Sequence, residues 1–411
     1  MAKRLQQISY SLSTVCIITI IVLLLAGLVP STTNAWAPSR IEGTNESVGD
    51  KDKDGDGNGD GDGNGGGDGD GDGDGNGNNL DQSYDIDVFV INYFPLTEDG
   101  LLDADVTGEE FLEGLSHEQI RQRTEDITNN WVFFIGEATT YLGYTEPDDV
   151  DASTSSGQPA LNYRIVDTVE NLEAVPIDPD SPVADYPDYQ QIMNDHNICD
   201  LVDNQGIDEV LIWAYQGFPV TRLAISESKM SSSQFGDVSN SPRFDDMPHC
   251  DNTYIVYMFN YARGTPEAIH AWGHQIEVEL SEVDPVLFRD RWQGPNYPQT
   301  LDVDGRCGSV HNAPNARFEY DSINPEPHPS DCLDWDPDGL GELSDISCEN
   351  WGCVENSDVD NPSLNYHVWN WQNLPGINND KEYQGEQLRN WWDVHGDFDN
   401  VMANSRSLTV N

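Results

Sequence analysis

Apolar and polar positions alternate between strand-like and helix-like patterns over residues 81–283. Apolar runs predict strands at 85–94, 161–167, 208–215 and 252–260. Amphipathic stretches predict helices at 116–141, 188–202 and 265–280. Strands that alternate with helices are typical of an α/β fold with a largely parallel sheet. We therefore predict one α/β domain over residues 81–411, with helices flanking the sheet.

The stretch from Thr265 to Leu280 carries the clearest helical pattern. Thr265 is a candidate N-cap, and Pro266 suits the first helical position. At about 100° per residue, one side of this helix forms an apolar stripe. The stripe consists of Ile269, Trp272, Ile276, Leu280 and Val283. His270, His274 and Glu277 follow one another along its flank, so this helix could hold a metal ion.

From about residue 290 the pattern becomes irregular. Beyond residue 16 the chain has six cysteines, and four of them lie in this region. Several tryptophans lie there too, among them Trp335, Trp351, Trp369, Trp371, Trp391 and Trp392. An even number of cysteines after an export signal favours disulfides. Cys348 and Cys353 could close a small loop around Trp351, and the other pairings stay open. We expect a disulfide-stapled, tryptophan-rich region that wraps the sheet.

The tryptophans also suggest a ligand. If residues 364–371 form a strand, His367, Trp369 and Trp371 lie on one face of it. Exposed indoles beside carboxylates can stack on sugar rings, whereas buried indoles fill cores. A polysaccharide or another envelope component is therefore an expected partner, and core packing is the alternative.

The N-terminus has the order of a secretory signal peptide over residues 1–37. Lys3 and Arg4 precede an apolar run at 15–29, and small residues follow up to Ala37. An uncleaved anchor is the alternative. If the apolar run is extended back to residue 8, it reaches the roughly 20 residues that span a bilayer. Both interpretations place the rest outside the cytoplasm, secreted or tethered to the cell surface, with no further membrane insertion.

Residues 38–80 predict a disordered acidic linker. Positions 49–80 are almost entirely Asp, Gly and Asn, a composition that cannot bury apolar surface. Residues 52–60 match the aspartate spacing of calcium loops, but Gly63 stands where an EF-hand has glutamate. We therefore expect only loose Ca²⁺ binding by the linker.

The chain carries a net charge of −55 and only five lysines. The linker accounts for little of this charge, because residues 49–80 contain ten aspartates and two lysines. An acidic folded surface is typical of proteins that work in high salt, where self-repulsion is screened. An ordinary acidic secreted protein is the alternative. A nucleic acid is not an expected partner, since one polyanion repels another.

Polar side chains follow the predicted strands, where α/β sheets bind ligands. They are Asn92, Tyr93, Tyr215, Gln216, Asn260, Tyr261 and Arg263. Arg263 immediately precedes the helix at 265–280, whose first free amides could receive an anionic group. Arg263 is therefore a candidate catalytic residue, and ordinary turn and cap roles are the alternative for the set.

His270-Ala271-Trp272-Gly273-His274 resembles the H-E-x-x-H helix of zinc metallopeptidases. The resemblance covers five residues and implies that His270 and His274 are zinc ligands. Glu277 and His311 are the candidates for a third ligand. The alternative is that both helical histidines border the packed stripe and bond neighbouring carboxylates.

The resemblance fails at the general base, because Ala271 stands where the family has glutamate. Another carboxylate must then take a proton from zinc-bound water, and Glu227 or Asp246 could serve. The sequence thus predicts a metal-dependent hydrolase with its site on helix 265–280. A non-catalytic surface module that binds glycans or envelope components is the alternative.

Overall fold

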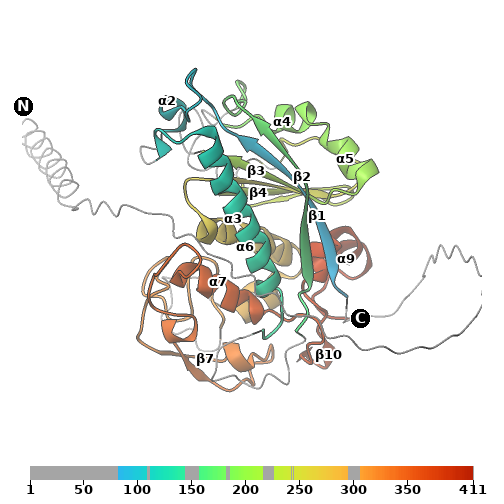
Figure 1. Ribbon diagram of the computed structural model, residues 1–411. Coiled ribbons are helices and arrows are strands. Elements are labelled where there is room, and N and C mark those ends of the chain that lie inside the picture. Colours follow the sequence, from blue (N-terminus) through green and yellow to red (C-terminus); the bar gives the residue numbers. More distant parts are fainter. Residues whose placement is uncertain are drawn as a thin grey trace, which may run out of the picture. The chain divides into compact units, whose positions relative to one another are not determined.

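A sheet of six strands lies at the centre of the computed structural model (Figure 1). The strands are β1 (Tyr84–Tyr93), β2 (Leu161–Asn171), β3 (Glu209–Ala214), β4 (Ser226–Ser232), β5 (Gly236–Ser239) and β6 (Tyr254–Asn260). Their order is β2-β1-β3-β6-β4-β5. The first four in this order run parallel, whereas β4 is antiparallel to both β6 and β5. The predicted α/β class with a largely parallel sheet is confirmed, and the β4–β5 hairpin was not expected.

The structure describes residues 82–108, 112–143, 157–181, 186–215, 226–241, 243, 245–294 and 306–410. The predicted signal peptide at 1–37 and the predicted linker at 38–80 lie outside these residues. None of the helices within the described ranges combines the length and apolar character needed to cross a membrane.

Helices cover both faces of the sheet (Figure 1). The helices of this part are α2 (Ala104–Thr107), α3 (His117–Ala138), α4 (Tyr189–Asp195), α5 (Ile198–Gln205) and α6 (Thr265–Val283). α3 and α6 pack on one face, and α4 and α5 lie on the other. Trp131 of α3 anchors its helix, with its ring 5.0 Å from that of Tyr163 and 5.9 Å from that of Tyr257. The predicted helix at 188–202 is two helices, because Asn197 adopts a positive φ of 52° between them.

Helix α6 follows β6 after a short turn and packs as its pattern predicts. All five residues of the apolar stripe are buried. The N-cap, however, is Gly264 with φ 91°, and Thr265 is the first helical residue. The amide of Thr265 donates to Asp358 Oδ2 at 3.1 Å, so an acidic residue far along the chain caps this helix.

The C-terminal region consists of short elements held by disulfides. They are η3 (Val286–Gln293), β7 (His328–Ser330), η4 (Cys332–Asp334), β8 (Ser344–Ile346), η5 (Cys348–Asn350), α7 (Pro362–Gln372), β9 (Glu382–Tyr383), β10 (Glu386–Gln387), α8 (Asp393–Gly396) and α9 (Phe398–Asn404). Disulfides join Cys199 to Cys250, Cys307 to Cys332 and Cys348 to Cys353. The last is the pair that the spacing suggested.

Residues 364–371 belong to helix α7, so the strand on which the shared face of His367, Trp369 and Trp371 depended does not form. Asn361 caps this helix by accepting from the amide of Ser363, and Pro362 occupies its first turn. The tryptophans of the C-terminal region are all buried. Their indoles fill the core and are not available to stack on a sugar ring.

Candidate metal centre

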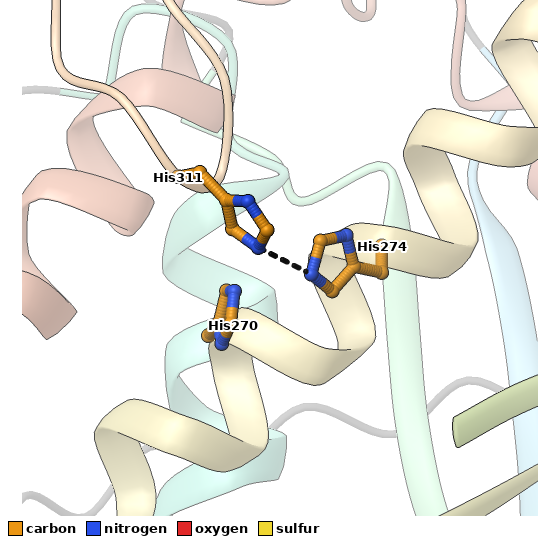
Figure 2. A group of neighbouring side chains, drawn as sticks. All are labelled: His270, His274 and His311. Carbon is orange, nitrogen blue, oxygen red and sulfur yellow. Dashed lines mark hydrogen bonds between the residues drawn. The ribbon is translucent and has the colours of Figure 1, made fainter. Parts of the chain in front are cut away.

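Three imidazoles converge between α6 and the loop that follows η3. They belong to His270, His274 and His311, and each offers a ring nitrogen within 4.8 Å of the other two. Figure 2 shows the rings turned toward one another, with His311 reaching down from its loop onto the helix. The Nε2 atoms of His274 and His311 lie 3.1 Å apart. The structure thus brings together both helical histidines and one of the two candidates for a third ligand.

The spacing of these nitrogens fits a tetrahedral ion. Two nitrogens bound to zinc at the usual bond length of about 2.0–2.1 Å lie roughly 3.3 Å apart, close to the His274–His311 distance. The Nε2 atom of His270 is buried and has no hydrogen-bond partner among the described residues. A buried nitrogen without a partner is costly, and an ion at the centre of the group would satisfy it.

Two carboxylates lie behind the helical histidines. The Oε2 atom of Glu277 is 3.1 Å from Nδ1 of His274, and Oε2 of Glu267 is 3.7 Å from Nδ1 of His270. A carboxylate on one ring nitrogen turns the other toward a metal and makes it a better donor. Glu277 therefore occupies the position of an orienting group in this structure, outside the converging nitrogens.

Both carboxylates are ionised. Burial by itself would raise the pKa of Glu267, but His270 and Arg263 outweigh it and lower the pKa to about 2. Burial also works against the charge on Glu277, yet the hydrogen bond from His274 keeps its pKa below the ordinary value. Burial, with the neighbouring His274 and His270, lowers the pKa of His311 to about 4. The site therefore offers a neutral imidazole at His311 and negative charge behind the other two rings.

Several contacts hold His311 over the helix. Cys307 is tied to Cys332, and its carbonyl accepts from Asn370 Nδ2 at 2.7 Å. The hydroxyl of Tyr366 donates to the carbonyls of Ser309 and Asn312, at 2.8 and 2.9 Å. The loop is therefore fixed from η4 and α7 before it reaches the helix.

The same loop also bonds α6 directly. The amide of Val310 donates to Glu277 Oε1 at 3.1 Å, and Gln293 Nε2 donates to the same oxygen at 2.5 Å. Glu277 therefore links the orientation of His274 to the position of the His311 loop.

Two further residues lie next to the three imidazoles: His367, which the sequence suggested only as part of a sugar-binding face, and Tyr320, which it did not suggest. His367 of α7 is buried, and its ring stacks on His270 at 5.5 Å with an interplanar angle of 17°. Burial holds the pKa of His367 well below its usual range, so this ring is neutral. The hydroxyl of Tyr320 lies 3.1 Å from Nε2 of His311. The signal in the sequence was only that Tyr320 lies nine residues after His311 in an irregular region.

Of the polar residues at the strand ends, Arg263 is linked to this cluster only through Glu267, the carboxylate behind His270. Arg263 pairs with Glu267, and Asp358 already occupies the helix amide that was expected to receive an anionic ligand. The site lies on the flank of α6 and not beyond the strands. Asn92, Tyr93, Tyr215, Asn260 and Tyr261 are buried, and Gln216 lies outside the described residues.

Glu227 of β4 belongs to a separate buried cluster. Its carboxylate accepts from the hydroxyls of Tyr186, Tyr189 and Ser241 at 2.7, 3.0 and 2.7 Å. Burial, the largest influence, raises its pKa. The other proposed base, Asp246, pairs with buried Lys229 at 2.7 Å. The catalytic role of Glu227 stays a prediction, and the structure does not place it against the histidines.

The sheet register puts Glu227 on the face opposite α6. Glu227 pairs with Met258, and the next residue of β4, Ser228, pairs with Tyr257. Tyr257 packs on Trp131 of α3, on the face that α6 shares. Because directly paired residues point to the same face, Ser228 faces α3 and α6, and Glu227 faces α4.

A pocket of about 370 Å³ lies at the amino ends of the parallel strands. Its lining includes Asp208, Glu209, His395, Asp397 and Asp399, and none of the three clustered histidines. The three histidines bring ring nitrogens within 4.8 Å of one another, an arrangement that a cavity alone does not provide. We therefore assign the candidate chemistry to the histidines.

A second group with metal-site spacing contains Cys199, Asp203 and Cys250. Its two cysteines form a disulfide and offer no thiolate. The sequence was also compared with family models and with curated proteins, and nothing matches in either comparison. The geometry of the histidine cluster is therefore the observation that bears on function.

Proposed function

We propose that this chain is a metal-dependent hydrolase whose ion is Zn²⁺ or a divalent ion of similar chemistry, held by His270, His274 and His311. The observation that carries the proposal is the convergence of their ring nitrogens within 4.8 Å. Three-histidine sites with an open fourth position are typical of catalytic zinc. Bound zinc lowers the pKa of water to near 7 and polarises a carbonyl.

The contacts suggest a separate role for each residue of the site. His270 and His274 bind the ion from one helical turn, and His311 binds it from the loop. Glu267 and Glu277 orient the two helical rings through their Nδ1 atoms. Ala271 is buried and has no acid–base group, so this chain cannot use the base of the zinc metallopeptidases that it resembles over five residues.

We also propose that the protein works outside the cytoplasm, secreted or tethered to the cell surface. Its three disulfides support an oxidising compartment. The predicted signal peptide, the acidic surface suited to high salt and the loose Ca²⁺ binding by the linker belong to the same proposal.

Metal analysis of protein purified in high salt tests the proposal. We expect one zinc ion per chain after dialysis against a weak chelator, and its loss in His274→Ala. His249→Ala is the matched control, because His249 has a side chain that is 65% exposed and lies outside the cluster. Hydrolysis of ester and peptide probes should stop with a strong chelator and return with Zn²⁺. Equal zinc content in His274→Ala and the parent would overturn the assignment.

The alternative is a non-catalytic module that binds glycans or envelope components. The exposed aromatic rings of Phe318 and Tyr320, 57% and 58% accessible, are the side chains that favour it. Retention on immobilised polysaccharide that survives metal removal, together with no hydrolysis, would support this second function.

A further inference from the structure

Tyr320 places its hydroxyl at the coordinating edge of the histidine cluster. Its oxygen lies 3.1 Å from Nε2 of His311, the same nitrogen that lies 3.1 Å from Nε2 of His274. Its ring centroid is 4.7 Å from that of His311 and 5.6 Å from that of His270. The phenol therefore lies over two of the three imidazoles, at the nitrogen that would bind the ion.

The backbone holds Tyr320 in an uncommon conformation. Its φ is 66°, in the left-handed region that bulky residues rarely adopt. Its amide donates to the carbonyl of His311 at 2.7 Å, and its carbonyl accepts from the amide of Ser322 at 3.0 Å. Residues held in sparsely populated conformations cluster at functional sites, because the surrounding structure must keep them there. Here the constraint couples Tyr320 directly to the residue that carries the third imidazole.

Tyr320 is more exposed than His270, His274 and His311, with 58% of its surface accessible to solvent. The imidazoles reach the site from the protein side, so a fourth tetrahedral position would lie toward this ring. A side chain that is half in solvent can swing away without leaving a cavity in the core.

We infer that Tyr320 is the fourth, exchangeable ligand of the ion held by His270, His274 and His311. This inference rests on the proposed metal site. When the ion enters, the phenol O–H bond breaks, the proton leaves to solvent and a metal–oxygen bond forms, with no change of oxidation state. When a substrate oxygen or water takes the position, the metal–oxygen bond breaks and the phenolate regains a proton from solvent. A metal ion favours the ionised form of such a ligand.

Cu²⁺ is the probe, because phenolate bound to Cu²⁺ gives a visible charge-transfer band that imidazole and carboxylate ligands do not. We expect one equivalent of Cu²⁺ to produce this band in the full chain. Tyr320→Phe should bind one equivalent without the band, and should bind Zn²⁺ at least about tenfold more weakly. Tyr383→Phe is the control and should keep both properties, since Tyr383 lies on β9 and contacts Arg291.

The outcomes separate the two proposals. Tight Cu²⁺ binding that is lost in His274→Ala, with no band in the parent or with a band that persists in Tyr320→Phe, overturns the role of Tyr320 and leaves the three-histidine site. Cu²⁺ binding that is unchanged by His274→Ala overturns the site itself and, with it, this inference.

Discussion

Gly273 of α6 lies against Val310 of the loop that carries His311. A Cβ atom at position 273 would lie 2.7 Å from Cγ1 of Val310 and 3.1 Å from the ring of Trp371. Real Cβ atoms do not approach this closely, so only glycine lets the loop reach the helix. Because Gly273 stands between the two helical ligands, it sets the distance between His311 and the other imidazoles.

Gly273→Ala is therefore expected to push the loop away from the helix. Overpacking of this kind costs about 1–3 kcal/mol of folding free energy. Zn²⁺ affinity should fall as well, because His311 moves. Urea unfolding and competitive Zn²⁺ titration measure the two effects.

Gly136→Ala in α3 provides the comparison for that substitution. Nothing lies within 4 Å of a Cβ atom there, so alanine should stabilise the helix by about 0.5–1 kcal/mol and leave Zn²⁺ affinity unchanged. Equal Zn²⁺ affinity in the two variants would contradict the role given to Gly273.

Glu277→Gln should weaken metal binding while the fold persists. The amide keeps an oxygen for the Val310 amide but removes the negative charge behind His274. Loss of an outer carboxylate costs roughly 10–100-fold in metal affinity. Competition with a chromogenic zinc chelator measures this, and circular dichroism checks the fold. If instead Glu277 were a direct ligand, as the sequence allowed, Glu277→Gln would bind less than one metal ion per chain.

Removal of the Cys307–Cys332 disulfide should affect stability and metal affinity together. This bond closes 25 residues and anchors the His311 loop, so its loss costs about 3 kcal/mol of folding free energy. The Cys199–Cys250 bond closes 51 residues, and its loss costs about 4 kcal/mol. We expect serine pairs at the first site to lower Zn²⁺ affinity, and serine pairs at the second to leave the affinity of the folded protein intact. Equal Zn²⁺ affinities for the two variants would argue against the anchoring role.

The two ligands on α6 could be predicted because their relative positions depend only on the local helical geometry. Helical periodicity alone places His270 and His274 on one flank, and both the stripe and the flank appear as expected. For the third ligand the sequence left two candidates, Glu277 and His311. The position of His311 depends on Asn370 and the Cys307–Cys332 bond, which act over long sequence separations.

Strand β4 was missed because its sequence lacks apolar alternation. Its residues Ser226–Ser232 read SESKMSS, and charged side chains ordinarily face water. In the structure Lys229 is fully buried because Asp246 pairs with it, and tyrosine hydroxyls satisfy Glu227. These partners come from distant segments, so no local pattern could have identified the strand.

A buried ion cluster beneath the sheet links α8 to the core. His395 Nδ1 lies 2.9 Å from Glu279 of α6, and its Nε2 lies 2.9 Å from Glu209 of β3. Tyr163 of β2 and Tyr257 of β6 also contact Glu209, at 3.0 and 3.4 Å. Burial by itself would lower the pKa of His395, but the carboxylates of Glu279 and Glu209 outweigh it and raise the pKa to about 10.

Stability should therefore fall as the pH rises above neutrality. A histidine whose pKa is higher in the folded chain stabilises fully below its unfolded pKa of about 6.5, and the stabilisation disappears as the pH passes through about 10. The free energy of unfolding should drop by up to about 1.4 kcal/mol per pH unit between pH 7 and 9. Urea midpoints at fixed high salt measure it.

His395→Gln should flatten this pH dependence, whereas His249→Gln, at an exposed position, should retain it. If the first variant does not fold, proton release during unfolding of the parent protein gives the same information. Unfolding at pH 8 should release close to one proton, because His395 is charged in the folded chain and neutral in the unfolded one. A stability that does not change between pH 7 and 9, with no proton released, would show that His395 is neutral in the core.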